Sequence, residues 1–314
     1  MEIRKLNKNL HSAKSDKNDE FYTQLSDIEK ELNHYKKHFK GKVVLCNCDD
    51  PRVSNFFHYF SYNFEHLGLK KLIATCYKSL NRDLFSQNDS EKAIYLEYNG
   101  FKNGESVPNP NEIGITYLNG DGDFRSKECI KLLKKADIVV TNPPFSLFRE
   151  YITQLIEYNK KFLVIGNINA ISYKECFELI KENKMWLGYN CARHFAKPDG
   201  TMYETARSFW YTNLDTTKRH EDVILYKTFL GNEEEYPIYE NFDAINIDKA
   251  TNIPLDYKGL MGVPITFMDK YNPDQFEIIG IDRVLVEELT GKVSRFHING
   301  KEIYARIIIR NKRI

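Results

Sequence analysis

Short apolar runs alternate with amphipathic segments of helical length from residue 42 to residue 183. The apolar runs are rich in β-branched residues and predict strands, whereas apolar residues recurring every three or four positions predict helices. The expected strands are 42–46, 71–77, 137–141 and 162–166, and the expected helices are 55–67, 127–135, 148–158 and 173–183. Because helical crossovers join parallel strands with one handedness, this alternation predicts an α/β fold with a doubly wound, mostly parallel sheet.

The segments outside this alternation are less regular. Residues 1–20 are polar and have no apolar period, which predicts a flexible N-terminal arm. A helix follows, with Ser26 or Asp27 as its N-cap and Gly41 after its end. Residues 79–116 contain many polar residues, prolines and glycines, and they predict a hairpin or an elaborated loop.

The pattern changes again after about residue 185, where short strands, many aromatic residues and scattered bases replace the long helical periods. We therefore predict a main catalytic domain over residues 21–185 and a smaller lobe over residues 186–314. The formal net charge of the chain is +1. Since so small a charge supplies almost no attractive field, an anionic partner must be held by local clusters of basic residues.

Cysteine spacing and hydropathy exclude several classes of protein. The six cysteines lie at irregular spacing, mostly in apolar surroundings, which predicts reduced thiols in the core and no disulfide framework. No group of Cys and His has the spacing of a zinc site, so we expect no metal. No apolar run approaches the ~20 residues that a bilayer-spanning helix needs. These features predict a cytoplasmic protein without a membrane contact, and we expect it to act as a monomer.

The sharpest local signal is the run that ends the predicted strand 137–141, where Asn142, Pro143, Pro144 and Phe145 follow a buried β-branched segment. Ligands of open α/β sheets bind at the carboxyl ends of strands. The exocyclic amine of a purine is a poor nucleophile, because its lone pair is delocalised into the ring. The Asn142 side-chain oxygen and the Pro143 carbonyl are candidates to accept its two hydrogens, and Phe145 is a candidate to stack on the base. The competing interpretation is a proline turn that ends a core strand.

Three further segments fall where a nucleoside cofactor would lie in such a sheet. Residues 18–24 precede the first helix, residues 48–54 follow the first strand, and the Gly-Asp-Gly-Asp-Phe run at 120–124 precedes a helix. A loop before a helix N-terminus can bind a carboxylate through its free N–H groups, and a carboxylate can pair with an ammonium. Taken singly, each of these segments also fits a solvated turn. The acidic run lacks the spaced ligands of an EF-hand calcium loop.

These segments resemble the EcoRI-type adenine-specific DNA methyltransferases of restriction-modification systems, and the resemblance extends over nearly the whole chain. The segments that carry it are 19–24, 46–57, 120–126, 141–151, 243–246 and 261–267. The resemblance implies a Rossmann-like methyltransferase sheet, S-adenosylmethionine as methyl donor, and a flipped adenine held at Asn142, Pro143, Pro144 and Phe145. It also implies direct transfer to N6 without a covalent enzyme intermediate.

By position, the resemblance implies a set of residues around the donor. They are Phe21, Tyr22, Thr23, Cys46, Asn47, Asp49, Asp50, Pro51, Thr75, Cys76, Asp121, Asp123 and Phe124. Thr75 and Cys76 stand where many methyltransferases carry an acidic residue for the ribose hydroxyls, so the ribose contact departs from that pattern. The region from about 189 to 212 also differs from the family pattern.

The variable region is where such enzymes are expected to read double-stranded DNA. Candidates for phosphate or guanine contacts are Arg193, His194, Lys197, Arg207, Lys218 and Arg219, with Phe195 and Tyr203 as possible wedges. For each of these basic residues, the alternative is a solvated basic surface over an aromatic core. The alternatives for the whole chain are N6-adenine methylation of RNA, methylation of a protein glutamine, or a non-catalytic DNA-binding protein with a methyltransferase fold. A functional pairing with a restriction endonuclease, without a stable complex, is also expected.

Overall fold

The computed structural model describes residues 22–78, 92–100, 110–196 and 200–314. Contacts between residues divide the chain into two compact units, of which the first comprises the residues up to Asn167 together with Gly188–Leu214. The second unit comprises Ile168–Leu187 and Asp215–Ile314. The chain thus passes between the units three times. The functional division predicted at residue 185 stays a prediction, and the predicted arm at 1–20 lies outside the described residues.

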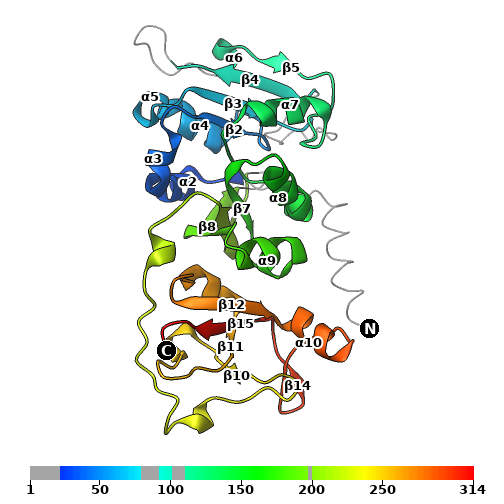
Figure 1. The fold of residues 1–314 in the computed structure, drawn as a ribbon. Coiled ribbons are helices and arrows are strands. Elements are labelled where there is room, and N and C mark those ends of the chain that lie inside the picture. The colour runs from blue at the N-terminus through cyan, green and yellow to red at the C-terminus, as the bar shows by residue number, and fades with distance from the viewer. Residues whose placement is uncertain (1–21, 79–91, 101–109, 197–199) are drawn as a thin grey trace. The chain divides into compact units, whose positions relative to one another are not determined.

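The first unit is built on a nine-stranded mixed sheet in the order β1-β8-β9-β7-β6-β2-β3-β4-β5 (Figure 1). The four central strands β7, β6, β2 and β3 pair in parallel, as predicted, whereas β1, β4, β5 and β9 pair antiparallel at the two sides. The strands are β1 Tyr22–Thr23, β2 Val43–Cys46, β3 Lys71–Thr75, β4 Ile94–Tyr98, β5 Thr116–Tyr117, β6 Ile138–Thr141, β7 Lys161–Asn167, β8 Trp186–Ala196 and β9 Met202–Thr212.

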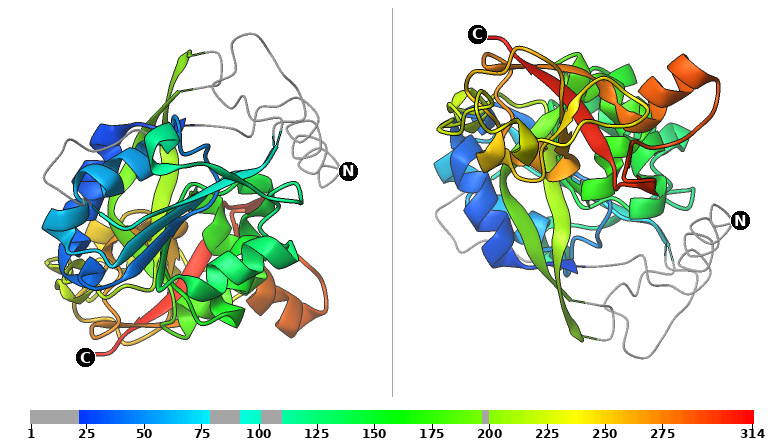
Figure 2. Two further views of the ribbon diagram at one scale, coloured as in Figure 1. Left: turned by 90° about the horizontal axis from the view of Figure 1, so that it is seen from above. Right: turned by 90° about the horizontal axis from the view of Figure 1, so that it is seen from below.

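Helices cover both faces of this sheet. They are α2 Leu25–Leu32, α3 Lys36–Phe39, α4 Asn55–Tyr62, α5 Phe64–Leu67, α6 Pro110–Ile113, α7 Lys127–Lys135 and α8 Phe148–Glu157, with the 3-10 helices η1 Asn33–Tyr35 and η2 Phe145–Leu147. Alternate strand residues such as Val44, Leu72 and Val140 share one buried cluster with Phe39 and Phe56 of the first helices. Figure 2 shows α2–α5 on one side of the central strands and α7 and α8 on the other.

The local signals for helix ends are mostly confirmed. The left-handed Gly68 ends α5 at the predicted position, although the predicted helix 55–67 is divided at Asn63. The predicted N-cap at Ser26 or Asp27 is wrong, because α2 already begins at Leu25 behind Gln24. Asp27 instead lies in the first turn, where its carboxylate accepts hydrogen bonds from β8.

The second unit contains a four-stranded sheet in the order β10-β11-β15-β12 and a small two-stranded sheet of β13 and β14. Its strands are β10 Ile245–Asn246, β11 Met261–Pro264, β12 Phe276–Ile281, β13 His297–Ile298, β14 Lys301–Glu302 and β15 Arg306–Asn311. Its helices are α9 Lys174–Lys181, α10 Asp282–Thr290, η3 Ile168–Ser172, η4 Lys218–His220, η5 Glu233–Glu235, η6 Ala250–Asn252 and η7 Ile265–Lys270. A separate core of Tyr239, Ala244, Val286, Phe296 and Ile308 stabilises it. Among the described helices, none has the length and apolar content to cross a bilayer.

Candidate active site

The Asn-Pro-Pro-Phe run lies at the carboxyl end of a central parallel strand. Strand β6 is buried at all four positions, and the run follows it directly before η2 begins at Phe145. The Asn142 side chain is buried, and Phe145 packs on the edge of the main core cluster. Because β2, β3 and β6 are parallel neighbours, the loops after Cys46 and Thr75 leave the same edge of the sheet as this run.

A cavity of about 200 Å³ opens beside Phe145. Its lining residues are Phe145, Asn167, Phe195, Tyr203, Thr205, Arg207 and Ser208. Sites for drug-sized ligands span roughly 300–1,000 Å³, so this cavity suits a single planar ring system. The sequence analysis missed Asn167, Thr205 and Ser208, because nothing in the sequence pairs the end of β7 with β9 at this point. Strand register brings them together: Asn167 lies opposite Ser208.

The two aspartates after β2 have different surroundings. Asp50 is fully buried, and its carboxylate accepts hydrogen bonds from the Arg52 backbone N–H at 2.9 Å and from Nε of Arg52 at 3.0 Å. This ion pair occupies both Asp50 oxygens. Asp49 is half-buried, with the Ser54 hydroxyl 3.5 Å from its Oδ2. Of the two residues predicted to pair with an ammonium, Asp49 is therefore the better placed.

A residue that the sequence analysis did not select connects two predicted donor segments. Tyr151 of α8 is fully buried, and its hydroxyl donates a hydrogen bond to Oδ1 of Asn47. Its ring packs edge-on against Phe124, with 5.1 Å between the ring centroids. Phe124 is itself buried and its ring supports this wall, while its contact with the donor's adenine stays a prediction. The sequence could have indicated Tyr151, because it lies in segment 141–151, one of the segments that carry the family resemblance.

The acidic run at 120–124 packs against the end of β3. A Cβ at Gly122 would collide with the backbone carbonyl of Cys76, and Gly122 has φ of +80°. The Asp121 carbonyl also accepts a hydrogen bond from the N–H of Lys78 at 2.8 Å. These contacts hold the run beside Cys76 and Lys78, just after β3, and donor contacts of Asp121 and Asp123 stay a prediction. The Arg125 guanidinium, 2.7 Å from the Asp123 carboxylate, lowers the pKa of Asp123.

The first strand places the N-terminal donor segment on β8. Tyr22 and Thr23 pair antiparallel with Ala196 and Phe195, and the Thr23 carbonyl accepts a hydrogen bond from the Asn55 side chain at 2.8 Å. Asn55 begins α4, directly after the loop that contains Asp49 and Pro51. Phe21, the remaining member of this segment, lies outside the described residues.

The thiols near these segments are not poised as nucleophiles. Burial raises the pKa of both Cys48 and Cys76 to about 12, and it raises the pKa of Cys46 well above its ordinary value. Since the thiolate is the nucleophilic form, these side chains are neutral packing groups near pH 7.

The basic residues that were predicted to contact DNA separate into two groups. Arg193, His194 and Arg207 are exposed on β8 and β9 of the first unit, and Arg207 also lines the cavity beside Phe145. Nδ1 of His194 lies 3.1 Å from a carboxylate oxygen of Asp27. Lys197 lies outside the described residues.

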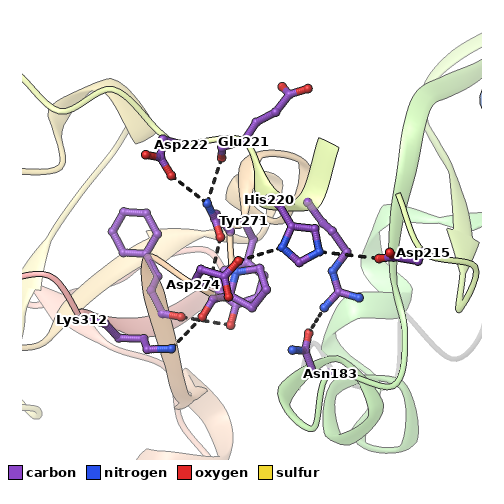
Figure 3. A network of polar contacts seen from close by, with 12 residues as sticks. Asn183, Asp215, His220, Glu221, Asp222, Tyr271, Asp274 and Lys312 are labelled. Atoms are coloured by element: carbon purple, nitrogen blue, oxygen red, sulfur yellow. Dashed lines mark hydrogen bonds and ion pairs between the residues drawn. The ribbon is translucent and has the colours of Figure 1, made fainter. Parts of the chain in front are cut away.

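Lys218 and Arg219 are held by neighbours within the second unit. Lys218 forms an ion pair with Asp269 at 2.6 Å, and Arg219 stacks on the Trp186 ring at 3.7 Å while bonding to Asn183. Figure 3 shows that the next residue of the same turn, His220, also has partners: its ring lies between the carboxylates of Asp215 and Asp274. These contacts favour a structural role for Lys218 and Arg219, and their contact with DNA stays a prediction.

An Asn-Pro-Pro-Phe turn on a central parallel strand is the arrangement that we expected of a methyltransferase acting on an amino group. The family model described as "Adenine-specific methyltransferase EcoRI" matches residues 9–312. The chain therefore belongs to the EcoRI family of adenine-specific methyltransferases. This confirms the enzyme class that the sequence predicted, an adenine-specific DNA methyltransferase.

Curated relatives match over almost their full length. The chain is 52% identical to Type II methyltransferase M.EcoRI of Escherichia coli, over 98% of both chains. It is 38% identical to M.MgeORF184P of Mycoplasma genitalium, over 96% of this chain and 98% of the relative. It is 36% identical to M.MpnI of Mycoplasma pneumoniae, over 96% of this chain and 97% of the relative. A search of the solved structures finds no match.

Proposed function

We propose that the chain transfers a methyl group from S-adenosylmethionine to the exocyclic N6 of an adenine in duplex DNA, within one short recognition sequence. The observation that carries this proposal is the position of the Asn142–Phe145 turn beside a small aromatic cavity at the carboxyl edge of the sheet. The mixed sheet with a parallel centre is compatible with a Rossmann-like methyltransferase fold.

The target base would occupy the cavity beside Phe145. Extruding a base from a duplex costs a few kcal/mol, and stacking on an aromatic ring returns roughly 1 to 3 kcal/mol per base. Phe145 supplies one ring, and Phe195 and Tyr203 supply aromatic surface from β8 and β9. With the base in place, Oδ1 of Asn142 and the carbonyl of Pro143 would accept hydrogen bonds from the amine. These acceptors stabilise the positive charge that develops on N6.

The residues at the strand ends fit the proposed methyl donor. Asp49 offers a carboxylate to an ammonium group, and Asp121 and Asp123 lie beside the end of β3 to accept from an adenine amine. Asp50 is less suited to the ammonium, because it is fully buried and paired with Arg52. S-adenosylmethionine would supply the methyl group on a sulfonium centre, from which direct transfer needs no enzyme nucleophile. The neutral thiols of Cys48 and Cys76 agree with such a route.

The exposed basic residues of β8 and β9 are the proposed DNA contacts of the first unit, with Arg193 and Arg207 as the main candidates. The relatives are named as Type II methyltransferases. This supports a place in a restriction-modification system, where methylation protects host DNA from a nuclease that need not bind the methyltransferase.

Methyl transfer from labelled S-adenosylmethionine to unmethylated genomic DNA tests the proposal directly. Nucleoside analysis should find N6-methyladenine, and sequencing of the modified sites should find one short motif. Transfer to RNA or to protein glutamine instead would refute the assigned substrate. Binding of DNA without any transfer would indicate a non-catalytic protein.

A further inference from the structure

Helix α2 carries two carboxylates that the proposed reaction does not use. Asp27 and Glu31 are four residues apart, so they project from the same face of the helix. Both are buried, with 8% and 0% of their surfaces exposed. Because burying a carboxylate without partners costs several kcal/mol, their neighbours must compensate for the lost water.

Hydrogen-bond donors surround the Glu31 carboxylate. Its carboxylate accepts from the backbone N–H groups of Tyr189 and Asn190, both at 2.8 Å, and from the Asn190 amide at 2.9 Å. The Tyr35 hydroxyl donates at 3.0 Å. Burial raises the pKa of Glu31, and these donors oppose that rise. The absence of a side chain at Gly188 admits the carboxylate, since a Cβ there would collide with Oε1 of Glu31.

Asp27 makes the matching contact one turn earlier. Its Oδ2 accepts hydrogen bonds from the backbone N–H groups of Arg193 and His194, both at 2.7 Å. Gln24 then donates to the His194 carbonyl, and β1 pairs with the next two residues of β8. Consecutive backbone groups of β8 are therefore bonded to one short N-terminal segment.

The same strand continues directly into the cavity beside Phe145. Phe195, the residue after His194, is almost fully buried and lines the cavity, and the neighbouring strand β9 adds Tyr203, Arg207 and Ser208. The position of this wall relative to Phe145 depends on where the edge of β8 is held.

We infer that Asp27 and Glu31 are positioning residues that hold β8 and β9 as the second wall of the target-base cavity. The inference rests on the proposed function, because it assumes that the cavity receives the flipped adenine. On this inference, the geometry in which the cavity holds the base depends partly on helix α2, which contacts neither the base nor the proposed reacting atoms.

The test compares Asp27→Ala and Glu31→Gln with the wild-type full chain on a duplex containing the motif found by genomic sequencing. Asp27→Ala removes the oxygen that accepts from both Arg193 and His194. Both oxygens of Glu31 accept from β8, and a neutral amide accepts at one heavy atom only, so Glu31→Gln turns a donor toward a β8 N–H group. We expect kcat/KM for DNA to fall about 10²-fold, as for a misplacement near 1 Å. A duplex with 2-aminopurine at the target position should lose most of its fluorescence increase on binding. The affinity for S-adenosylmethionine should change less than threefold.

Glu29→Gln is the matched control, because Glu29 lies exposed on the same helix and the substitution removes the same charge. Its kinetics and fluorescence should equal those of the wild type. If Glu31→Gln does not fold, Asp27→Ala and Gly188→Ala carry the test, since Gly188→Ala displaces the Glu31 carboxylate. Folded variants with wild-type kcat/KM and fluorescence would overturn the inference, as would a loss confined to donor affinity. A wild type inactive on DNA would instead refute the proposed function.

Discussion

The hydroxyl of Tyr151 donates a hydrogen bond to the side-chain oxygen of Asn47, which lies 104 residues earlier in the chain. The ring of Tyr151 meanwhile packs on Phe124. One buried side chain of α8 thus orders two loops that the sequence analysis assigned separately to the methyl donor.

Tyr151→Phe should weaken both folding and donor binding. The variant keeps the ring against Phe124 but removes the donor to Asn47, which should cost about 1 kcal/mol of unfolding free energy. Because Asn47 is a proposed donor contact, the Kd for S-adenosylmethionine should rise. Urea unfolding and calorimetric titration measure the two effects. Tyr62→Phe, at an exposed position, should change neither quantity, and an unaltered Kd for Tyr151→Phe would remove Asn47 from the donor site.

Asn142→Ala should abolish most of the turnover without disturbing donor binding. It removes one of two proposed acceptors for the N6 hydrogens, which by analogy with single oxyanion-hole donors costs about 2.7–4 kcal/mol, or roughly 10²–10³ in kcat. Single-turnover transfer at saturating DNA measures the loss. A variant with normal turnover would show that the assigned role is wrong.

Asp49→Asn should weaken donor binding, whereas Asp50→Asn should destabilise the fold. Asp50 is fully buried and bonded to Arg52, so its substitution should lower the unfolding free energy by roughly 1.5–3 kcal/mol, the range for hydrogen bonds to charged groups. Asp49 is half-buried, and its substitution should mainly raise the Kd for S-adenosylmethionine. Thermal unfolding and donor titration of both variants decide between them. The assignment fails if Asp50→Asn is stable and loses donor affinity.

Gly122→Ala should be far more damaging than Gly114→Ala. Both glycines have positive φ, so an alanine is strained at either position by roughly 1–3 kcal/mol. Only at Gly122 would the new Cβ also collide with a backbone carbonyl, whereas Gly114 faces open space. Chemical unfolding should therefore separate the two variants. Equal stabilities would contradict the packing of the acidic run on the end of β3.

Glu97 should contribute stability that depends on pH. Lys71, whose ammonium bonds to this carboxylate, lowers the pKa of Glu97, and Lys135 adds to the effect. A carboxylate with a lowered folded-state pKa stabilises the fold above its unfolded pKa of about 4.3, and this contribution is lost as the pH falls below that value. Glu97→Gln should be less stable than the wild type at pH 7, by roughly 0.2–1 kcal/mol for each partly exposed pair. The difference should shrink toward pH 3 in denaturant titrations, and a constant difference would contradict this account.

The parallel centre of the sheet could be predicted because its residues signal it locally. The runs at β2 and β6 are buried at every position and apolar except at Thr141, as expected of strands covered on both faces. The Asn142–Phe145 turn was equally visible, since strand, amide, prolines and aromatic ring are consecutive. The resemblance of long segments then identified the family before any geometry was known.

Other parts of the site depend on pairings between distant residues. Asp27 is a good N-cap residue by composition, yet a helix that begins two residues earlier gives its carboxylate to β8. Lys218 and Arg219 look like DNA contacts in the sequence, yet Asp269 and Trp186 hold them in the second unit. Neither partner lies within helical or turn spacing, so no local pattern could have indicated it.

The sequence by itself determined the family, the strands of the central sheet and the loop that ends β6, because short-range hydrophobic periodicity and consecutive motifs specify these features. Only the tertiary structure decided which carboxylates are available to a ligand, which are consumed by internal hydrogen bonds, and which strands wall the cavity beside Phe145. The physical reason is that burial and hydrogen-bond satisfaction depend on neighbours in space, and β8 meets α2 more than 150 positions away in the chain.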